Sequence, residues 1–213
     1  MSPLLPVLPR RRIAISCAHV GTHGARSPCG RVIEEPFSRL VAGWLMRELA
    51  GEHEVRLVAE PLERKAQKVN DLDPSLVVEV HVNAAVTRDV WDSDRDGDVD
   101  ELVPAPGVGG HFALYQPGST RGRTLARDIC VGLSVELPDR EPRGALPAEP
   151  PYIARKRLEL LAETRCPAVI VECLHVTNPD EVTFLAHPDA PRVVARGVAR
   201  GIRSWLLTDG DSP

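Results

Sequence analysis

The chain has 213 residues, 43% of them hydrophobic, and its formal net charge is −4. This length suits one domain that buries roughly 70% of its unfolded surface, and it excludes two large domains. The small negative charge excludes an overall attraction for nucleic acid or for an anionic membrane surface.

The amino-terminal segment lacks the features of a targeting signal. In residues 1–11 the apolar residues precede the arginines and are interrupted by prolines, the reverse of a secretory signal. No later segment approaches the ~20 apolar residues that cross a bilayer. The five cysteines are odd in number and irregularly spaced, which indicates free thiols in a reducing compartment. We therefore expect a protein made in the cytoplasm, with no membrane partner.

Strand patterns and helix patterns alternate along the chain, which predicts an α/β fold. The predicted elements are a strand at 12–17, a loop at 18–30, a helix at 34–50, a strand at 54–58, a helix at 63–70, strands at 76–84 and 111–115, a helix at 119–137, a strand at 167–172, and helices at 180–185 and 188–206. We expect a single domain at 12–207 with a mostly parallel twisted sheet flanked by helices. Residues 1–11 and 208–213 are expected to be tails.

Two segments interrupt this alternation. Residues 88–108 form an acidic insertion, and residues 138–151 contain five prolines. A long proline-rich segment in a compact domain predicts a functional loop.

The run from Leu76 to Ala84 is the clearest strand. It is rich in β-branched residues, follows the turn signal Asp73-Pro74, and is too uniformly apolar for an amphipathic helix. It therefore predicts a buried parallel strand. His81 lies near its carboxyl end, the edge at which open α/β sheets bind ligands.

Three further polar residues accompany His81. His19 follows the first strand, Glu34 begins the first helix, and Glu172 ends the apolar run Val-Ile-Val. Two imidazoles and a carboxylate, with one position left for water, form a catalytic zinc arrangement, and a second carboxylate off the metal suits a general base. Since burying an unpaired charge is costly, Glu172 predicts a polar partner.

These residues resemble the zinc-dependent N-acetylmuramoyl-L-alanine amidases, a family of cell-wall hydrolases. The family's Asp-Pro-Gly-His-Gly-Gly aligns with residues 16–21, its Glu-Lys with 34–35, its Ser-Ile-His-x-Asn with 79–83, its Pro-x-x-Leu-x-Glu-x-Gly-Phe-x-x-Asn with 167–178, and two shorter patterns with 62–70 and 110–115. The resemblance covers nearly the whole chain in the same order.

The resemblance implies that His19, Glu34 and His81 bind zinc and that Glu172 acts as acid and base. Glu35 is an alternative ligand, but Glu34 aligns the apolar helix positions better with the family pattern. The family also differs from this chain at several positions. Ser16, Val20, Glu35 and Glu79 stand where the family has Asp, Gly, Lys and a small polar residue, and Cys173 precedes Leu174 where Gly-Phe is usual.

The implied reaction is hydrolysis of the amide between N-acetylmuramic acid and L-alanine in peptidoglycan or muropeptides. Asn83 is expected to contact the substrate. A protein made without a leader must reach the cell wall by another route, as phage endolysins do, or act on imported fragments.

The acidic insertion contains a second metal pattern. Acidic oxygens at positions 1, 3, 5 and 9, with glycine at position 6, are typical of a calcium loop, although the glutamate of position 12 is replaced by Val103. The calcium ligands would be Asp92, Asp94, Asp96, Asp98 and Asp100. The alternative is a solvated acidic loop.

Three other functions are consistent with the sequence. Another zinc amidohydrolase or carboxypeptidase would act on a small soluble amide and use an arginine to bind a free carboxylate, with Arg121, Arg123 and Arg143 as candidates. A non-catalytic wall-binding relative is disfavoured because Glu172 is retained. A Cys173–His175 nucleophile pair is disfavoured because two residues on one strand provide no third orienting group.

Overall fold

The computed structural model describes residues 10–85, 105–150, 153 and 157–209. The elements are β1 (Arg12–Cys17), α1 (Glu34–Leu49), β2 (Glu54–Val58), α2 (Leu62–Leu72), β3 (Leu76–Asn83), β4 (His111–Tyr115), α3 (Thr120–Glu136), β5 (Pro142–Pro147), α4 (Glu159–Glu163), β6 (Ala168–His175), α5 (Pro179–Leu185) and α6 (Ala190–Asp209). The calcium pattern from Asp92 to Asp100 lies outside the described residues. None of the described helices has both the length and the apolar character needed to cross a membrane.

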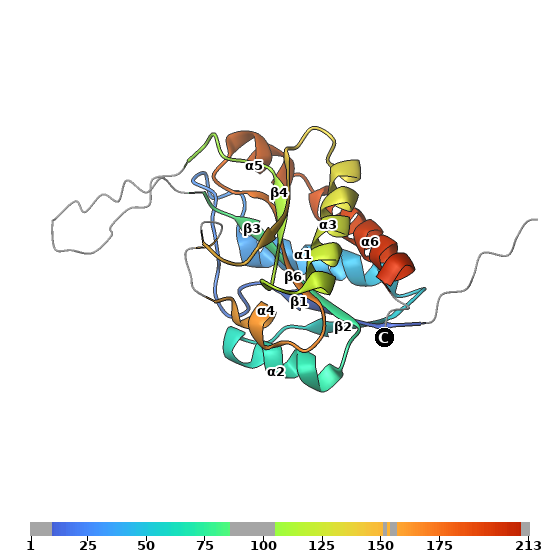
Figure 1. The fold of residues 1–213 in the computed structure, drawn as a ribbon. Coiled ribbons are helices and arrows are strands. Elements are labelled where there is room, and N and C mark those ends of the chain that lie inside the picture. Colours follow the sequence, from blue (N-terminus) through green and yellow to red (C-terminus); the bar gives the residue numbers. More distant parts are fainter. Residues whose placement is uncertain (1–9, 86–104, 151–152, 154–156, 210–213) are drawn as a thin grey trace, which may run out of the picture.

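The strands form one mixed sheet of six strands in the order β2-β1-β3-β6-β4-β5 (Figure 1). Strands β2, β1, β3 and β6 are parallel, whereas β4 and β5 run together in the opposite direction to β6. This arrangement confirms the predicted α/β fold with a mostly parallel sheet. The strands β1, β3 and β6 are almost uniformly buried because helices cover both of their faces, and most of their residues are apolar.

The two faces of the sheet belong to two apolar cores. Helices α1, α3 and α6 cover one face, and the shorter helices α2 and α4 cover the other. On β3, Val78 and Val80 pack into the first core and Val77 into the second. Since side chains alternate along a strand, Glu79 and His81 lie on the same face as Val77, toward α2 and α4.

The proline-rich segment differs from its prediction. Residues 138–151 include the strand β5, so the prediction of a long loop there was wrong. Proline is tolerated in β5 because this is an edge strand, in which a missing N–H leaves no partner unpaired. The helix α4 was not predicted, and α6 extends to Asp209, two residues into the predicted tail.

Ala85 and Ala105, which flank residues 86–104 between β3 and β4, lie side by side. The amide of Ala105 donates a hydrogen bond to the carbonyl of Ala85 at 2.9 Å. The amide of Ala85 in turn donates to Oγ1 of Thr177 at 3.1 Å, which links this point to the segment after β6.

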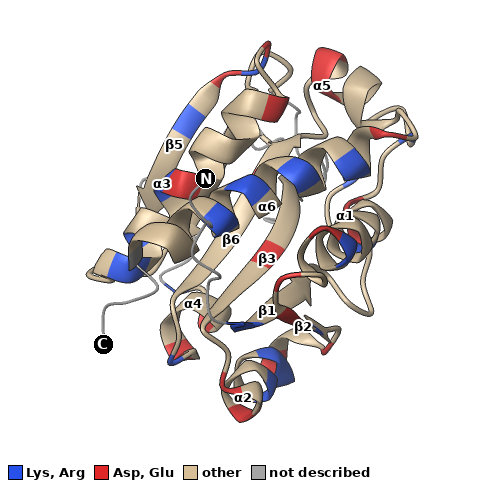
Figure 2. Cartoon of the chain, turned by 90° about the vertical axis from the view of Figure 1, so that its right-hand side faces the viewer, with Lys and Arg blue, Asp and Glu red and all other residues tan. Residues whose placement is uncertain are grey.

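Helices α3 and α6 pack with their backbones unusually close. A Cβ added at Gly201 of α6 would lie 2.3 Å from Cα of Ile129, and one added at Gly132 of α3 would lie 2.2 Å from the carbonyl oxygen of Gly197. The outer side of α6 carries arginines (Figure 2), of which Arg196 and Arg200 pair with Glu136. Glycine on the inner side thus sets the distance between the two helices.

Replacing Gly201 with alanine should therefore destabilise the protein. The added methyl group meets backbone atoms that cannot rotate away, and overpacking of this kind costs roughly 1 to 3 kcal/mol. The free energy of unfolding, measured with urea, should fall. Gly43→Ala is the matched control, because this exposed glycine of α1 has no atom within 4 Å of its added Cβ, so helix propensity should raise stability by up to about 1 kcal/mol. An equal response of the two variants would contradict the close-packing argument.

Candidate metal centre

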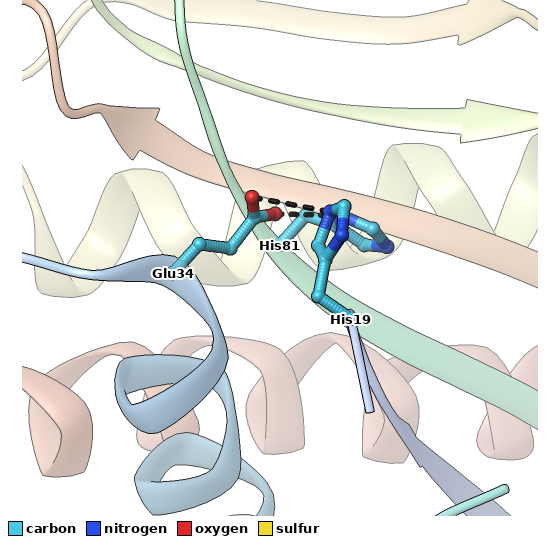
Figure 3. Close-up of side chains that lie close together, drawn as sticks. All are labelled: His19, Glu34 and His81. Carbon is cyan, nitrogen blue, oxygen red and sulfur yellow. Dashed lines mark hydrogen bonds and ion pairs between the residues drawn. The ribbon is translucent and has the colours of Figure 1, made fainter. Parts of the chain in front are cut away.

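Three segments far apart in the sequence bring their polar side chains together at the carboxyl end of the sheet (Figure 3). His19 follows β1, Glu34 begins α1, and His81 lies near the end of β3. The potential ligand atoms of these three residues all lie within 4.8 Å of one another. Two imidazoles and one carboxylate at this separation can hold a divalent metal ion such as zinc.

Glu34 is the centre of this group. Its Oε2 lies 3.2 Å from Nε2 of His19, and its Oε1 lies 2.8 Å from Nδ1 of His81. The backbone amides of Ala25 and Val82 donate to the same carboxylate at 2.6 and 3.3 Å. Burial favours the neutral acid, but these partners hold the pKa of Glu34 down at about 2. The carboxylate is therefore charged and fixed.

The loop that carries His19 passes directly over Glu34. His19 has a left-handed backbone with φ of 53°. Gly24 has φ of 63°, and a Cβ there would come within 2.5 Å of Oε2 of Glu34 and 2.7 Å of the His19 ring. Only glycine fits at this position, so Gly24 shapes the site without contributing a ligand.

His81 is held between two carboxylates. Its Nδ1 contacts Glu34, and its Nε2 lies 3.7 Å from Oε1 of Glu79, which itself forms an ion pair with Lys65. Burial disfavours a charged imidazole, but Glu34 and Glu79 raise the pKa of His81 to about 10. Burial also opposes ionisation of Glu79, yet His81 and Lys65 keep the pKa of Glu79 below its usual value.

Glu172 lies beside His81 in the sheet. The two residues are partners in the parallel register of β3 and β6. The Oε2 atom of Glu172 is buried and has no hydrogen-bond partner among the described residues. Burial raises the pKa of Glu172 to about 7, against the opposing effect of His81, and the charge of Glu34 adds to the rise. A carboxylate with this pKa can both accept and donate a proton near neutral pH.

A cavity of about 540 Å³ adjoins the histidines. Its walls are mostly apolar, with contributions from Val20, Pro61, Leu62, Leu158, Leu160 and Ile170. His19, His81, Lys65 and Glu79 supply polar groups to the same cavity. The side chains of His19 and His81 are 38% and 18% exposed, whereas that of Glu34 is 4% exposed. Solvent therefore reaches the three-residue group through the two histidines.

Residues 13–204 match the sequence pattern of one protein family, N-acetylmuramoyl-L-alanine amidase. This match spans most of the 213 residues. The chain belongs to this amidase family. Family membership confirms the resemblance drawn from the motifs and the expected class of enzyme, and it supports peptidoglycan amidase activity. No curated protein matches the sequence.

Solved amidase structures share the fold. An N-acetylmuramoyl-L-alanine amidase from Clostridium difficile 630 has a TM-score of 0.74 at 20% identity, over 94% of this chain and 99% of that one. The CwlD amidase from Clostridioides difficile, solved in complex with the GerS lipoprotein, has a TM-score of 0.74 at 16% identity, over 94% and 100%. The catalytic domain of an endolysin that targets Clostridia difficile has a TM-score of 0.69 at 21% identity, over 92% and 98%.

The contacts and burial of Glu35 and Cys173 bear on the alternative roles that the sequence left open for these two residues of the amidase. Glu35 accepts a hydrogen bond from Nε of Arg39 at 3.0 Å, so its carboxylate is engaged outside the cluster of potential ligand atoms. Cys173 is fully buried in the core under α1, α3 and α6, and burial raises the pKa of its thiol well above the usual value. Burial therefore argues against a nucleophilic Cys173, as the sequence also did, because only an accessible thiolate reacts.

Two other residues singled out in the amidase sequence, Asn83 and Arg121, lie outside the three-residue group. Asn83 is half-buried at the end of β3, pairs with His175, and is not among the residues that line the cavity of about 540 Å³. Arg121 lines a different cavity with Pro74 and Pro167, which precede β3 and β6, so it lies at the opposite end of these strands.

Sequence reasoning gave no role at the candidate metal centre to three residues that adjoin it. Gly24, Lys65 and Glu79 act through contacts with residues from other segments, which spacing along the chain does not reveal. The replacement of a small polar residue by Glu79 was visible in the sequence, and a search for a compensating cation could have led to Lys65.

Proposed function

We propose that this amidase hydrolyses the bond between N-acetylmuramic acid and L-alanine, with zinc held by His19, Glu34 and His81. The observation that carries the proposal is the convergence of these three side chains from β1, α1 and β3, with ligand atoms within 4.8 Å. The donor set fits zinc because it combines two imidazoles with one charged carboxylate. When bound, zinc would lower the pKa of a water molecule toward about 7 and polarise the amide carbonyl.

In this proposal Glu172 accepts the proton of the attacking water and passes it to the leaving amine. Its pKa of about 7 suits both steps, because the carboxyl group is neither fully protonated nor too weak a base. Because Glu172 of β6 pairs in register with His81 of β3, the proposed base lies near the same carboxyl ends of the strands as the proposed ligands. The charged Glu34 stays bound to two backbone amides and keeps the ligand geometry fixed during the reaction.

The proposed substrate is peptidoglycan or a soluble muropeptide. The cavity of about 540 Å³ beside His19 and His81 provides apolar walls for the peptide side of the amide. Asn83 remains the proposed polar contact to the substrate. We propose residues 12–207 as the catalytic domain. We also propose the cell wall as its place of action, because the fold is shared with the catalytic domain of an endolysin.

Digestion of purified peptidoglycan with the zinc-loaded protein tests this proposal. Mass spectrometry should show stem peptides that begin with free L-alanine and glycan strands that have lost their peptides. Release of neither product from sacculi, together with cleavage of small soluble amides, would instead identify a different zinc amidohydrolase. A protein that binds sacculi and cleaves nothing would be a wall-binding relative.

Gly24→Ala is expected to weaken zinc binding strongly while leaving the fold intact. The added methyl group would overlap Oε2 of Glu34 and the ring of His19, so two proposed ligands would have to move. Gly21→Ala is the matched control, since Gly21 also has a positive φ, 85°, but open space around its Cβ. Zinc affinity, measured by competition with a chelator, should fall much further for Gly24→Ala. Equal losses in the two variants would mean that loop strain, rather than contact with the ligands, is responsible.

A further inference from the structure

The two ring nitrogens of His81 face two different carboxylates. Nδ1 lies 2.8 Å from Oε1 of Glu34, on the side of His19, whereas Nε2 lies 3.7 Å from Oε1 of Glu79. Glu79 precedes His81 by two residues on β3, so both side chains lie on the same face of the sheet. The imidazole is therefore flanked by one carboxylate on the ligand side and another behind it.

Glu79 keeps its charge because a buried cation accompanies it. Only 3% of Glu79 and 2% of Lys65 is exposed, and Nζ of Lys65 contacts Oε1 of Glu79. Nζ also donates to the carbonyl of Cys17 at 2.8 Å, two residues before His19. A buried pair of this kind carries a desolvation cost that the attraction between its charges only partly offsets, so it adds little net stability.

We propose that Glu79 is a positioning residue for the metal centre, held in place by Lys65. With a metal ion bound to Nδ1, the Glu79 carboxylate would face the proton that remains on Nε2 of His81 and so orient the ring toward Glu34 and His19. Which nitrogen of a histidine binds a metal is decided by the partner of the other nitrogen, and a carboxylate in that place fixes the ring and strengthens the ligand. The proposal rests on the proposed zinc site.

Lys65 has a second part in this arrangement. Its charge balances Glu79, so that the carboxylate adds little net negative charge near Glu34 and Glu172. Its bond to the Cys17 carbonyl joins α2 to the end of β1, from which the His19 loop departs. One lysine thus links the supports of both histidines.

The test compares zinc binding in the wild type and in a Lys65→Met, Glu79→Gln double variant. Removing both charges together avoids leaving either one buried alone. Chelator competition should show zinc affinity reduced by roughly 10- to 100-fold, the usual effect of losing a partner of a metal-bound histidine. In the cobalt-loaded protein, the Nε2 proton of His81 should exchange with solvent faster than in the wild type, an effect that a purely structural ion pair would not produce.

Glu181→Gln is the matched control, because Glu181 is equally buried, at 3%, but contacts backbone amides of Gly110 and His175 rather than the metal site. Its zinc affinity should stay at the wild-type value. If the double variant does not fold, Glu79→Asp serves instead, since it keeps the charge for Lys65 but withdraws the carboxylate from His81, and it should also weaken zinc binding. Wild-type affinity and proton exchange in a folded Glu79 variant would overturn the positioning role alone. A wild-type protein that binds no zinc would overturn the proposed function as well.

Discussion

Glu172→Gln is expected to lower the rate of peptidoglycan cleavage by about 10²- to 10⁴-fold while zinc remains bound. Glutamine keeps the size of the side chain but cannot accept the proton of the attacking water. The register pairing with His81 places Glu172 beside the proposed ligands, and its pKa of about 7 matches the task of a base near neutral pH. Turnover and zinc content should be measured on the same preparation.

The same variant should gain stability in its metal-free form. The pKa of Glu172 is raised in the folded state from 4.5 to about 7, so the wild-type protein loses stability as pH rises through this range, when the buried carboxylate must ionise. Glu172→Gln removes that cost, and its thermal midpoint should exceed that of the wild type at pH 8 more than at pH 4. Activity close to that of the wild type, with zinc bound, would falsify the general-base role.

Glu34→Ala is expected to empty the metal site, whereas Glu35→Ala should leave it occupied. Glu34 contacts both histidines and is the only carboxylate of the described three-residue group, so its loss removes a ligand and the anchor of the other two. The affinity for zinc should fall beyond the 10- to 100-fold that loss of an outer partner costs. Glu35→Ala breaks only the surface pair with Arg39, worth at most about 1 kcal/mol.

Zinc stoichiometry by metal analysis, together with chelator competition, distinguishes the two neighbouring glutamates. The comparison is well matched because both residues belong to the first turn of α1. Loss of zinc in Glu35→Ala, with full occupancy in Glu34→Ala, would shift the ligand by one residue and contradict the assignment of the site.

Much of this fold was predictable because its central strands are buried on both faces. The β3 and β6 sequences are apolar enough to be identified by pattern alone, and a polar residue near the end of such a strand is conspicuous. For this reason His81 and Glu172 could be selected from sequence, and the structure pairs them in register. The roles of these two residues stay predictions until the variants are measured.

Other features depend on contacts that no local pattern encodes. The reversed direction of β4 and β5 depends on how the chain returns after β3, and β5 contains prolines that usually indicate a loop. Gly24 matters only because the His19 loop lies against α1, and Lys65 only because α2 lies over β3. Tertiary contacts of this kind became visible only with the structure.

The hydrogen bond between Ala105 and Ala85 has a consequence for how this enzyme can diversify. Because these two alanines lie side by side, residues can be added or deleted between them without shifting the register of β3 or β4. The entropic cost of a longer excursion grows only slowly, by about 0.6 kcal/mol for each doubling of its length. This point thus tolerates changes in the length of the connection between β3 and β4 while the position of His81 on β3 is kept.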